Sequence, residues 1–357
     1  MRATAPTLLV AVAAAAGPPT GAPPAPTIGC GTRFQKTGKA DLLINPNSSA
    51  FDSYNIMHPL VAQVAGRWLM YYSGGPDSGM PGYHNHQLGL ASAAQPTGPW
   101  RRHGAPLLPL GPKDADHDHG PPTLLRGETN AALLEDGLFT MLYTGNKNNT
   151  IFRATSANGL AWRKAGPIGL DGYAPSVLRV NGLLWLFYVA PDPHNGGMWS
   201  IMLARGADWG SLQKLGAVIV TNTQPWEQNK VFYPYVLYEK AAGWTMGYSA
   251  YANRSVIGLP PKGTSGTLAG ATGLAHSADG VSWVKCPTNP VLAPTPGSDY
   301  DSIYTTQPSI VTVDERGAPL PQPLMFYGGR IDFPKGVEQH KYYSVAHAVA
   351  EARQAPR

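Results

Sequence analysis

The sequence predicts an all-β fold, a five-bladed β-propeller with four-stranded antiparallel blades. The composition combines 41 Gly, 35 Pro, 17 Tyr and 9 Trp with only 14% charged residues, which is typical of short strands joined by tight turns. An aromatic strand-like segment recurs five times, and further strand-like segments recur around it in the same order. A β-sandwich would also contain many short strands, but not one four-part order repeated five times. The repeat therefore favours blades around a central channel.

Every copy of the aromatic segment carries a tyrosine two residues before its end. Its five copies are WLMYYSG, FTMLYTG, LWLFYVA, WTMGYSA and PLMFYGG, which carry Tyr72, Tyr143, Tyr188, Tyr248 and Tyr327. Each copy is short, apolar and bounded by Gly or Ser, as expected for a strand inside a sheet. Successive tyrosines are 45 to 79 residues apart, which fits blades whose loops differ in length.

Two other segments complete each predicted blade. A small-residue strand follows the aromatic one, as in LGLASA and TGLAHSADGVSW, and an S-x-D/N-G turn leads from it to a Trp-bearing outer strand. The segment that precedes each aromatic strand is expected to be innermost. These innermost candidates are HPLVAQV, NAALLED, APSVLRV, YPYVLYE and QPSIVTV.

Residues 1–26 are expected to be a signal peptide and a Pro/Ala-rich leader, and residues 27–357 a single propeller domain. The first 26 residues hold one Arg, a short apolar run and small residues suited to cleavage. The apolar run is too short to span a bilayer, so we expect a secreted protein, extracellular or periplasmic, that does not bind membranes. A disordered leader on a cytosolic protein is the alternative.

The distribution of charge narrows the range of binding partners. The net charge of +5 is not concentrated in any basic run, so no nucleic-acid partner is expected, and we expect a monomer.

Cys30 and Cys286 are the only cysteines. They could form one long-range disulfide or remain two buried thiols, since sequence does not place their Cβ atoms.

Several of the repeated strings resemble the five-bladed propeller glycoside hydrolases of families 43, 32, 117 and 130. The strings are MYYSG with LGLASA, LYTG with ATSANGLAW, and AHSADGVSW with NPVL, and the likeness extends from about Asp52 to Ala350. It implies a carbohydrate substrate, a pocket where the innermost strands begin, and hydrolysis of a poly- or oligosaccharide by paired carboxylates. Carried over by blade, it implies Asp52 as base or nucleophile, Asp171 as modulator and Glu227 as acid.

The innermost strand starts supply the other candidate site residues, because such starts converge on one pocket. The expected substrate-binding residues are His58, Glu128, Asn130, Trp226, Tyr233, Asp301, Gln307 and Arg330. In family 43 the acids of the first and third blades directly precede the strand proline, whereas this chain has His58 and Ala174 there. The alternative function is therefore a catalytically silent propeller that binds glycan or a protein partner.

Three of the acids share a spacing that also permits a structural interpretation. Asp52, Glu227 and Asp301 each lie seven residues before a proline, and such a carboxylate can fix the loop that enters a blade. The Asp/His-rich segment KDADHDHGPP is interpreted as a pocket-rim loop, because its spacing selects no particular metal. We expect no required cofactor and no catalytic metal, and we consider the channel a candidate position for a structural Ca²⁺ ion.

Overall fold

The computed structural model describes residues 28–45, 50–75, 86–111, 116, 118–145, 149–261, 267–332 and 343–351. The predicted signal peptide and leader lie outside the described residues, as do Asp114 and His117 of the Asp/His-rich segment. Strands dominate, with two short 3₁₀ helices, η1 (Pro193–Asn195) and η2 (Arg254–Ile257). Neither helix of the described part has the length and apolarity needed to cross a membrane.

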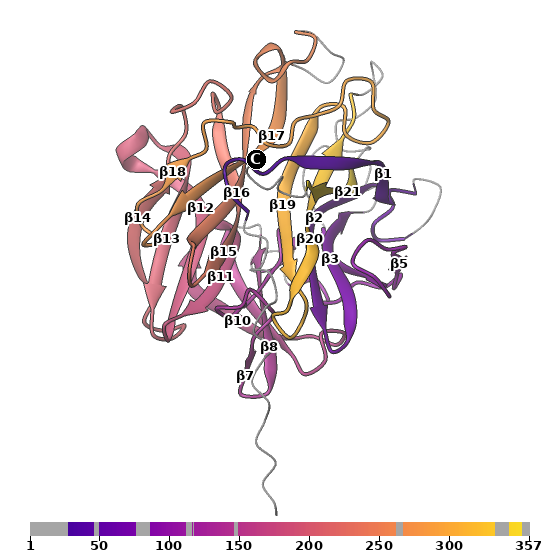
Figure 1. Ribbon diagram of the computed structural model, residues 1–357. Coiled ribbons are helices and arrows are strands. Elements are labelled where there is room, and N and C mark those ends of the chain that lie inside the picture. Colours follow the sequence, from indigo (N-terminus) through magenta and orange to yellow (C-terminus); the bar gives the residue numbers. More distant parts are fainter. Residues whose placement is uncertain are drawn as a thin grey trace, which may run out of the picture.

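The strands form the antiparallel blades of a five-bladed propeller, which confirms the predicted fold class (Figure 1). Blade one contains β2 (Asn55–Val64), β3 (Arg67–Gly75), β4 (Gln87–Ala93) and β5 (Arg101–Arg102). Blade two contains β6 (Thr123–Leu124), β8 (Leu138–Gly145), β9 (Thr150–Ser156) and β10 (Arg163–Asp171), with the short β7 (Leu134–Glu135) paired to β8. Blade three contains β11 (Tyr173–Val180), β12 (Leu183–Asp192), β13 (Met198–Gly206) and β14 (Gln213–Ile219).

The last two blades are joined into one hydrogen-bonded sheet by a single parallel pairing, Gly270 with Tyr304. Blade four contains β15 (Lys230–Glu239), β16 (Gly243–Asn253), β17 (Leu268–Ser277) and β18 (Val284–Lys285). Blade five contains β19 (Tyr304–Val313), β20 (Pro319–Arg330), β21 (Tyr343–Ala350) and β1 (Phe34–Leu43).

The outermost strand of blade five comes from the other end of the described chain. β1 pairs antiparallel with β21, and Figure 1 shows the two side by side. A disulfide between Cys30 and Cys286 then joins the segment before β1 to the segment after β18. Of the two states that the sequence left open for these cysteines, the structure has the disulfide. The circle of blades is thus closed by a strand pairing and by a covalent bond.

The aromatic doublet of the repeat has two separate packing roles. In blade one the first ring, Tyr71, lies 5.8 Å from Trp162 of blade two, and its hydroxyl donates to the Gly159 carbonyl. In blade three Phe187 likewise contacts Trp283 of blade four, 5.7 Å away. The first aromatic therefore packs one blade against the next. The tyrosine that follows it points back into its own blade, as described below.

The structure corrects the predicted innermost strand of blade two. We expected NAALLED to be that strand, with Asn130 at the pocket, but its Leu134–Glu135 portion forms the short β7. The innermost strand is β6, which follows Gly120-Pro121-Pro122. The segment after Gly120 lines the hub pocket with Pro121, Pro122 and Thr123, whereas the start of NAALLED lies farther along the axis.

Candidate functional site

Strained backbone marks the end of the axis at which the innermost strands begin. His58, Ala174, Tyr233 and Gln307 have φ values of 57°, 51°, 54° and 64°, although left-handed backbone costs a non-glycine residue about 1 kcal/mol. Each directly precedes a proline and lies at a register shift between the first and second strands of its blade. Such bulges redirect side chains and are common beside functional sites.

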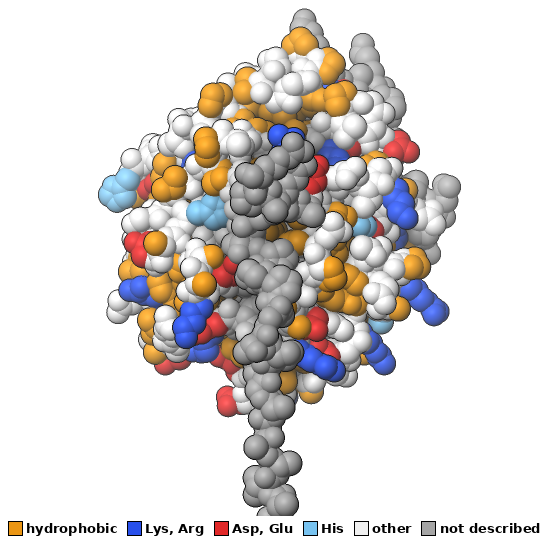
Figure 2. All heavy atoms as spheres, viewed as in Figure 1, with side chains coloured by type: hydrophobic (Ala, Val, Ile, Leu, Met, Phe, Trp, Pro, Cys, Tyr) orange, Lys and Arg blue, Asp and Glu red, His pale blue; other side chains and the backbone are white. Residues whose placement is uncertain are grey.

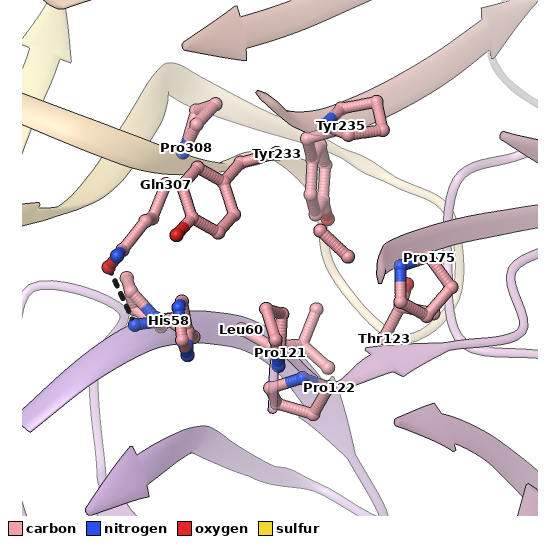
Figure 3. A pocket seen from close by; sticks show the side chains of 13 residues that line it. His58, Leu60, Pro121, Pro122, Thr123, Pro175, Tyr233, Tyr235, Gln307 and Pro308 are labelled. Carbon is pink, nitrogen blue, oxygen red and sulfur yellow. Dashed lines mark hydrogen bonds between the residues drawn. The ribbon is translucent and has the colours of Figure 1, made fainter. Parts of the chain in front are cut away.

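These residues surround one pocket, here called the hub pocket, to which all five blades contribute (Figure 3). It is lined by His58, Pro59, Leu60, Pro121, Pro122, Thr123, Ala174, Pro175, Tyr233, Pro234, Tyr235, Gln307 and Pro308. The structure therefore brings together His58, Tyr233 and Gln307, three of the predicted substrate-binding residues. The lining residues include no carboxylate.

The polar groups of the hub pocket are fixed by bonds between blades. The Gln307 side-chain Oε1 accepts a hydrogen bond of 2.8 Å from the His58 backbone N (Figure 3), and the Gln307 backbone N donates to Ser249 Oγ of blade four. The His58 ring lies 5.3 Å from the Tyr233 ring. Neither ring nitrogen of His58 has a hydrogen-bond partner among the described residues, although its side chain is buried. Buried polar atoms are nearly always bonded, so this imidazole is suited to bind a ligand.

The buried His58 is expected to make the fold sensitive to acid. Burial, and then the nearby His86, lower the pKa of His58 well below its usual 6.5. The folded state therefore keeps a neutral imidazole while the unfolded chain gains a proton below pH 6.5. From this group, stability is complete above pH 6.5 and falls by about 1.4 kcal/mol for each pH unit below it, until the folded pKa is reached.

His58→Asn is expected to flatten the fall of Tm between pH 6.5 and pH 5, because Asn cannot titrate there and tolerates positive φ. The same change at the exposed His194 serves as the control and is expected to leave the curve as in the wild type. Parallel curves for His58→Asn and the wild type would contradict this assignment.

Two of the predicted catalytic acids are held inside their blades. Glu227 Oε1 accepts a 2.7 Å hydrogen bond from Tyr248 of β16, and its Oε2 lies 2.5 Å from Lys285 Nζ of β18. Asp52 Oδ2 accepts a 2.6 Å hydrogen bond from Tyr72 of β3 and lies 3.5 Å from Arg102 Nη1 of β5. Each acid thus joins the second and the outermost strand of its blade.

The same arrangement occurs in blades two and five. Asp116 accepts from Tyr143 at 2.5 Å and pairs with Lys164 at 2.7 Å, and Asp301 accepts from Tyr327 at 3.0 Å and pairs with Lys36 at 2.7 Å. We call these four sets the acid–tyrosine–cation braces. Each carboxylate pairs with a cation of its own blade and none lines the hub pocket, which favours the structural interpretation of the repeated acid at Asp52, Glu227 and Asp301.

Hydrogen bonds in the braces shift the pKa of their members in opposite directions. Burial, and then Asp52, raise the pKa of Tyr72, so that this phenol remains a donor. Burial alone would raise the pKa of Asp116, but hydrogen bonds from His119, Lys164 and Tyr143 outweigh it and hold the pKa at about 2. Asp116 therefore stays charged, and Tyr72 stays protonated, throughout the neutral range.

The remaining predicted site residues lie elsewhere. Asp171 is exposed on β10 and accepts a hydrogen bond from Thr150, and the exposed Glu128 accepts one from the Asn181 backbone. The Asn130 amide bonds both backbone groups of Tyr238, at the opposite end of the axis. Trp226 is buried against the Tyr248 ring, 5.5 Å away, and its Nε1 donates to Gln224. Structure therefore separates these four from the hub pocket.

A carboxylate–imidazole pair that sequence analysis did not single out lies at the junction of blades one and two. Asp118 Oδ1 accepts from the His86 backbone N at 2.8 Å and lies 3.0 Å from His86 Nδ1. Both residues are buried, and His86 is close enough to His58 to affect its pKa. A carboxylate on Nδ1 fixes the tautomer of a neutral imidazole, with Nε2 as the basic atom. Neither residue lines the hub pocket, but His86 lowers the pKa of His58, which makes the pair a candidate for proton transfer beside that pocket.

Aromatic rings and two cations lie above the bulges of blades four and five. Lys230 Nζ lies 4.6 Å from the Phe232 ring centre and 4.9 Å from that of Tyr251. Arg330 lies over the Tyr304 ring, 4.9 Å from its centre, opposite Tyr304 in the strand ladder. We call these five residues the rim. Phe232, Tyr251 and Arg330 are buried, whereas Lys230 and Tyr304 are half-buried, so the Tyr304 ring is the one of the three rings that a ligand can reach most easily.

Two further features of the described residues bear on binding, the surface charges and one cluster of potential metal ligands. Figure 2 shows basic and acidic side chains interspersed over the face that it presents. Among the described residues, the one cluster of three potential metal ligands is Cys30, His276 and Cys286. Both of its sulfurs belong to the disulfide, and oxidised sulfur is not a thiolate ligand. This cluster is consequently no metal site.

Comparison with known proteins gives structural neighbours only. No protein-family model matches the sequence, and no curated protein matches it significantly. Similar solved structures include a glycosyl hydrolase from Bacteroides ovatus, with 16% identity, TM-score 0.65, and coverage of 89% of this chain and 93% of that one. A structure from the family 130 of mannoside phosphorylases and glycoside hydrolases that target β-1,2-mannosidic linkages in Candida mannan has 16% identity, TM-score 0.64, and coverage of 89% and 93%.

A thermostable family-43 glycoside hydrolase has 15% identity, TM-score 0.60, and coverage of 85% of this chain and 95% of that one. At such identities the likeness establishes the fold. The chain is thus similar over most of its length to propellers described as glycoside hydrolases, which agrees with the resemblance found in its repeated strings.

Proposed function

We propose that this protein is a glycoside hydrolase in which a sugar lies over the mouth of the hub pocket, whose volume of about 30 Å³ admits a hydroxyl group but not a sugar ring. The observation that carries the proposal is His58, a buried imidazole whose ring nitrogens have no partner in the described part of the chain, in a pocket ringed by strained residues. The half-buried rings of Tyr233 and Tyr304 would stack on sugar faces, and His58 would bond a sugar hydroxyl. The similar structures described as glycoside hydrolases support the reaction class by analogy of fold, and the site residues have to decide it.

For the proton transfer we propose the Asp118–His86 pair in place of Glu227 and Asp52. Glycoside hydrolysis requires a group that protonates the leaving oxygen and a second group that activates water or attacks the sugar. Asp118 is a buried carboxylate outside the four braces, and it positions an imidazole that would serve as the proton-transferring group.

The test compares Asp118→Asn with Glu227→Gln on a panel of polysaccharides and aryl glycosides, at a temperature where both variants are folded. We expect Asp118→Asn to lower kcat by about 100-fold or more, because general acid–base catalysis contributes at least that much, and Glu227→Gln to retain activity. The reverse pattern would assign catalysis to the braced acids.

A second candidate function follows from the absence of carboxylates among the hub pocket's lining residues. A propeller without paired carboxylates could bind glycan without cleaving it. Binding of a polysaccharide to the wild-type protein without any release of sugar, over the whole panel, would favour this catalytically silent propeller.

We also propose that the protein acts outside the cytoplasm. The disulfide supports this, since such bonds persist in oxidising compartments, and the predicted signal peptide agrees with it. Recovery of a mature chain that begins near residue 27 from the medium or periplasm would support export, and an intact N-terminus in the cytosol would contradict it.

A further inference from the structure

Arg126 is a buried cation that forms no ion pair among the described residues. Its residue is 1% exposed, its Nη2 donates to Ser176 Oγ at 3.1 Å, and its guanidinium lies 4.1 Å from the centre of the Tyr235 ring. Nε and Nη1 have no hydrogen-bond partner among the described residues. Arg126 likewise forms no ion pair with any carboxylate that the structure describes.

The guanidinium lies beside a small cavity on the propeller axis, here called the axial cavity. The innermost strands of blades one, two, four and five line it, and Leu60 and Tyr235 are shared with the hub pocket. Thr312 of β19 also lines the axial cavity, and its buried hydroxyl is unbonded within the described chain. Two side chains with unused donors therefore meet one cavity.

The other polar groups of the axial cavity are already bonded. The Asn130 amide bonds Tyr238, and the carboxylate of Asp314 accepts from the backbone N of Arg316 and of Ala318. The cavity volume of about 20 Å³ holds one water-sized particle or a single monoatomic ion.

A bare guanidinium in this position is energetically unfavourable. Arginine does not lose its proton in proteins, and a buried charge without compensation is strongly destabilising. The cation–π contact with the Tyr235 ring offsets only part of that cost. The carboxylate of Asp314 lines the same cavity but bonds backbone N–H groups and forms no ion pair with Arg126 among the described residues, so an anion within the cavity would supply the missing acceptor.

We propose that the axial cavity binds a monoatomic anion, chloride under ordinary conditions, held by Arg126 and Thr312. The charge of Arg126 would repel the structural Ca²⁺ ion for which the channel was a candidate. Since Leu60 and Tyr235 line both cavities, the anion would support the base of the hub pocket.

Thermal unfolding at constant ionic strength tests the proposal, with chloride exchanged against the large anion gluconate. The wild-type Tm is expected to rise by about 2 °C for each tenfold increase in chloride above its Kd, because an anion that binds only the folded state stabilises it. Arg126→Met, which keeps the aliphatic stem, is expected to lose this rise. Arg179→Met, which removes an arginine paired with Glu135, is the matched control and should keep it.

Two further measurements keep the proposal decidable if Arg126→Met does not fold. Thr312→Val, which removes only the hydroxyl, is expected to raise the chloride concentration needed for half the Tm rise by about tenfold. Crystals grown in bromide are expected to show an anomalous peak in the axial cavity. A Tm that ignores chloride in the wild type, or a cavity without a bromide peak, would show that only water binds there.

Discussion

Glu227→Ala is expected to lower the free energy of unfolding by about 3–5 kcal/mol, because it removes one partner of a buried ion pair and leaves the other. Lys285 would keep its charge with no acid beside it, and Tyr248 would lose the acceptor of its hydroxyl. Burial already lowers the pKa of Lys285, and Glu227 opposes that shift. For a cooperative domain of this size the loss corresponds to roughly 4–7 °C in Tm.

Two controls isolate the ion pair. Glu128→Ala removes the same residue type from an exposed position with one backbone hydrogen bond, and we expect it to cost no more than about 1 kcal/mol. The double variant Glu227→Ala with Lys285→Ala is expected to be more stable than the sum of the single losses predicts, because no charge is then left unpaired. Equal Tm values for Glu227→Ala and Glu128→Ala would contradict a structural role for Glu227.

The architecture could be predicted because packing between blades imposes a repeat that sequence retains. The ring at Tyr71 or Phe187 packs on the Trp of the next blade, and the tyrosine beside it has to reach the acid of its own blade. The tyrosine recurs in all five blades and reaches an acid in four of them, whereas the aromatic residue before it is present in blades one, three and five. The pocket residues at His58, Tyr233 and Gln307 were predictable for the same reason, since each precedes a strand proline.

The sequence indicated only two of the three members of each brace. The acids and the tyrosines were identified, but the third member was missed. An aromatic residue followed two positions later by a cation occurs at Trp100-Arg102, Trp162-Lys164, Trp283-Lys285 and Phe34-Lys36, and in each case that cation pairs with the acid. Reading these pairs together would have indicated that the acids are neutralised within their blades.

Other parts of the site depend on contacts that no local pattern specifies. His86 and Asp118 are 32 residues apart, and nothing in the sequence around them indicates that they meet. The burial of Arg126 without an ion pair could not be predicted from the sequence either, because arginine is ordinarily a surface residue. Tertiary structure alone shows that its guanidinium crosses from blade two to Ser176 of blade three and Tyr235 of blade four.

Loss of the disulfide is expected to have the second large effect on stability. Cys30 and Cys286 are 256 residues apart, and in the chain-entropy model a loop of this length stabilises the fold by about 5 kcal/mol through restriction of the unfolded chain. The double variant Cys30→Ala with Cys286→Ala should therefore melt roughly 7 °C below the oxidised wild type. A reductant should lower the Tm of the wild type and leave that of the variant unchanged.

The position of the disulfide also predicts which strands open first when it is removed. Cys30 lies just before β1, which closes blade five by pairing with β21 and by the Lys36 brace. Without the disulfide, β1 can detach while the other strands remain paired, because local opening starts where the fewest contacts must break. Amide exchange is thus expected to accelerate in β1 and β21 well before β3 or β12. Uniform acceleration in all blades would show that the disulfide acts only on the unfolded chain and that β1 is held by its pairing alone.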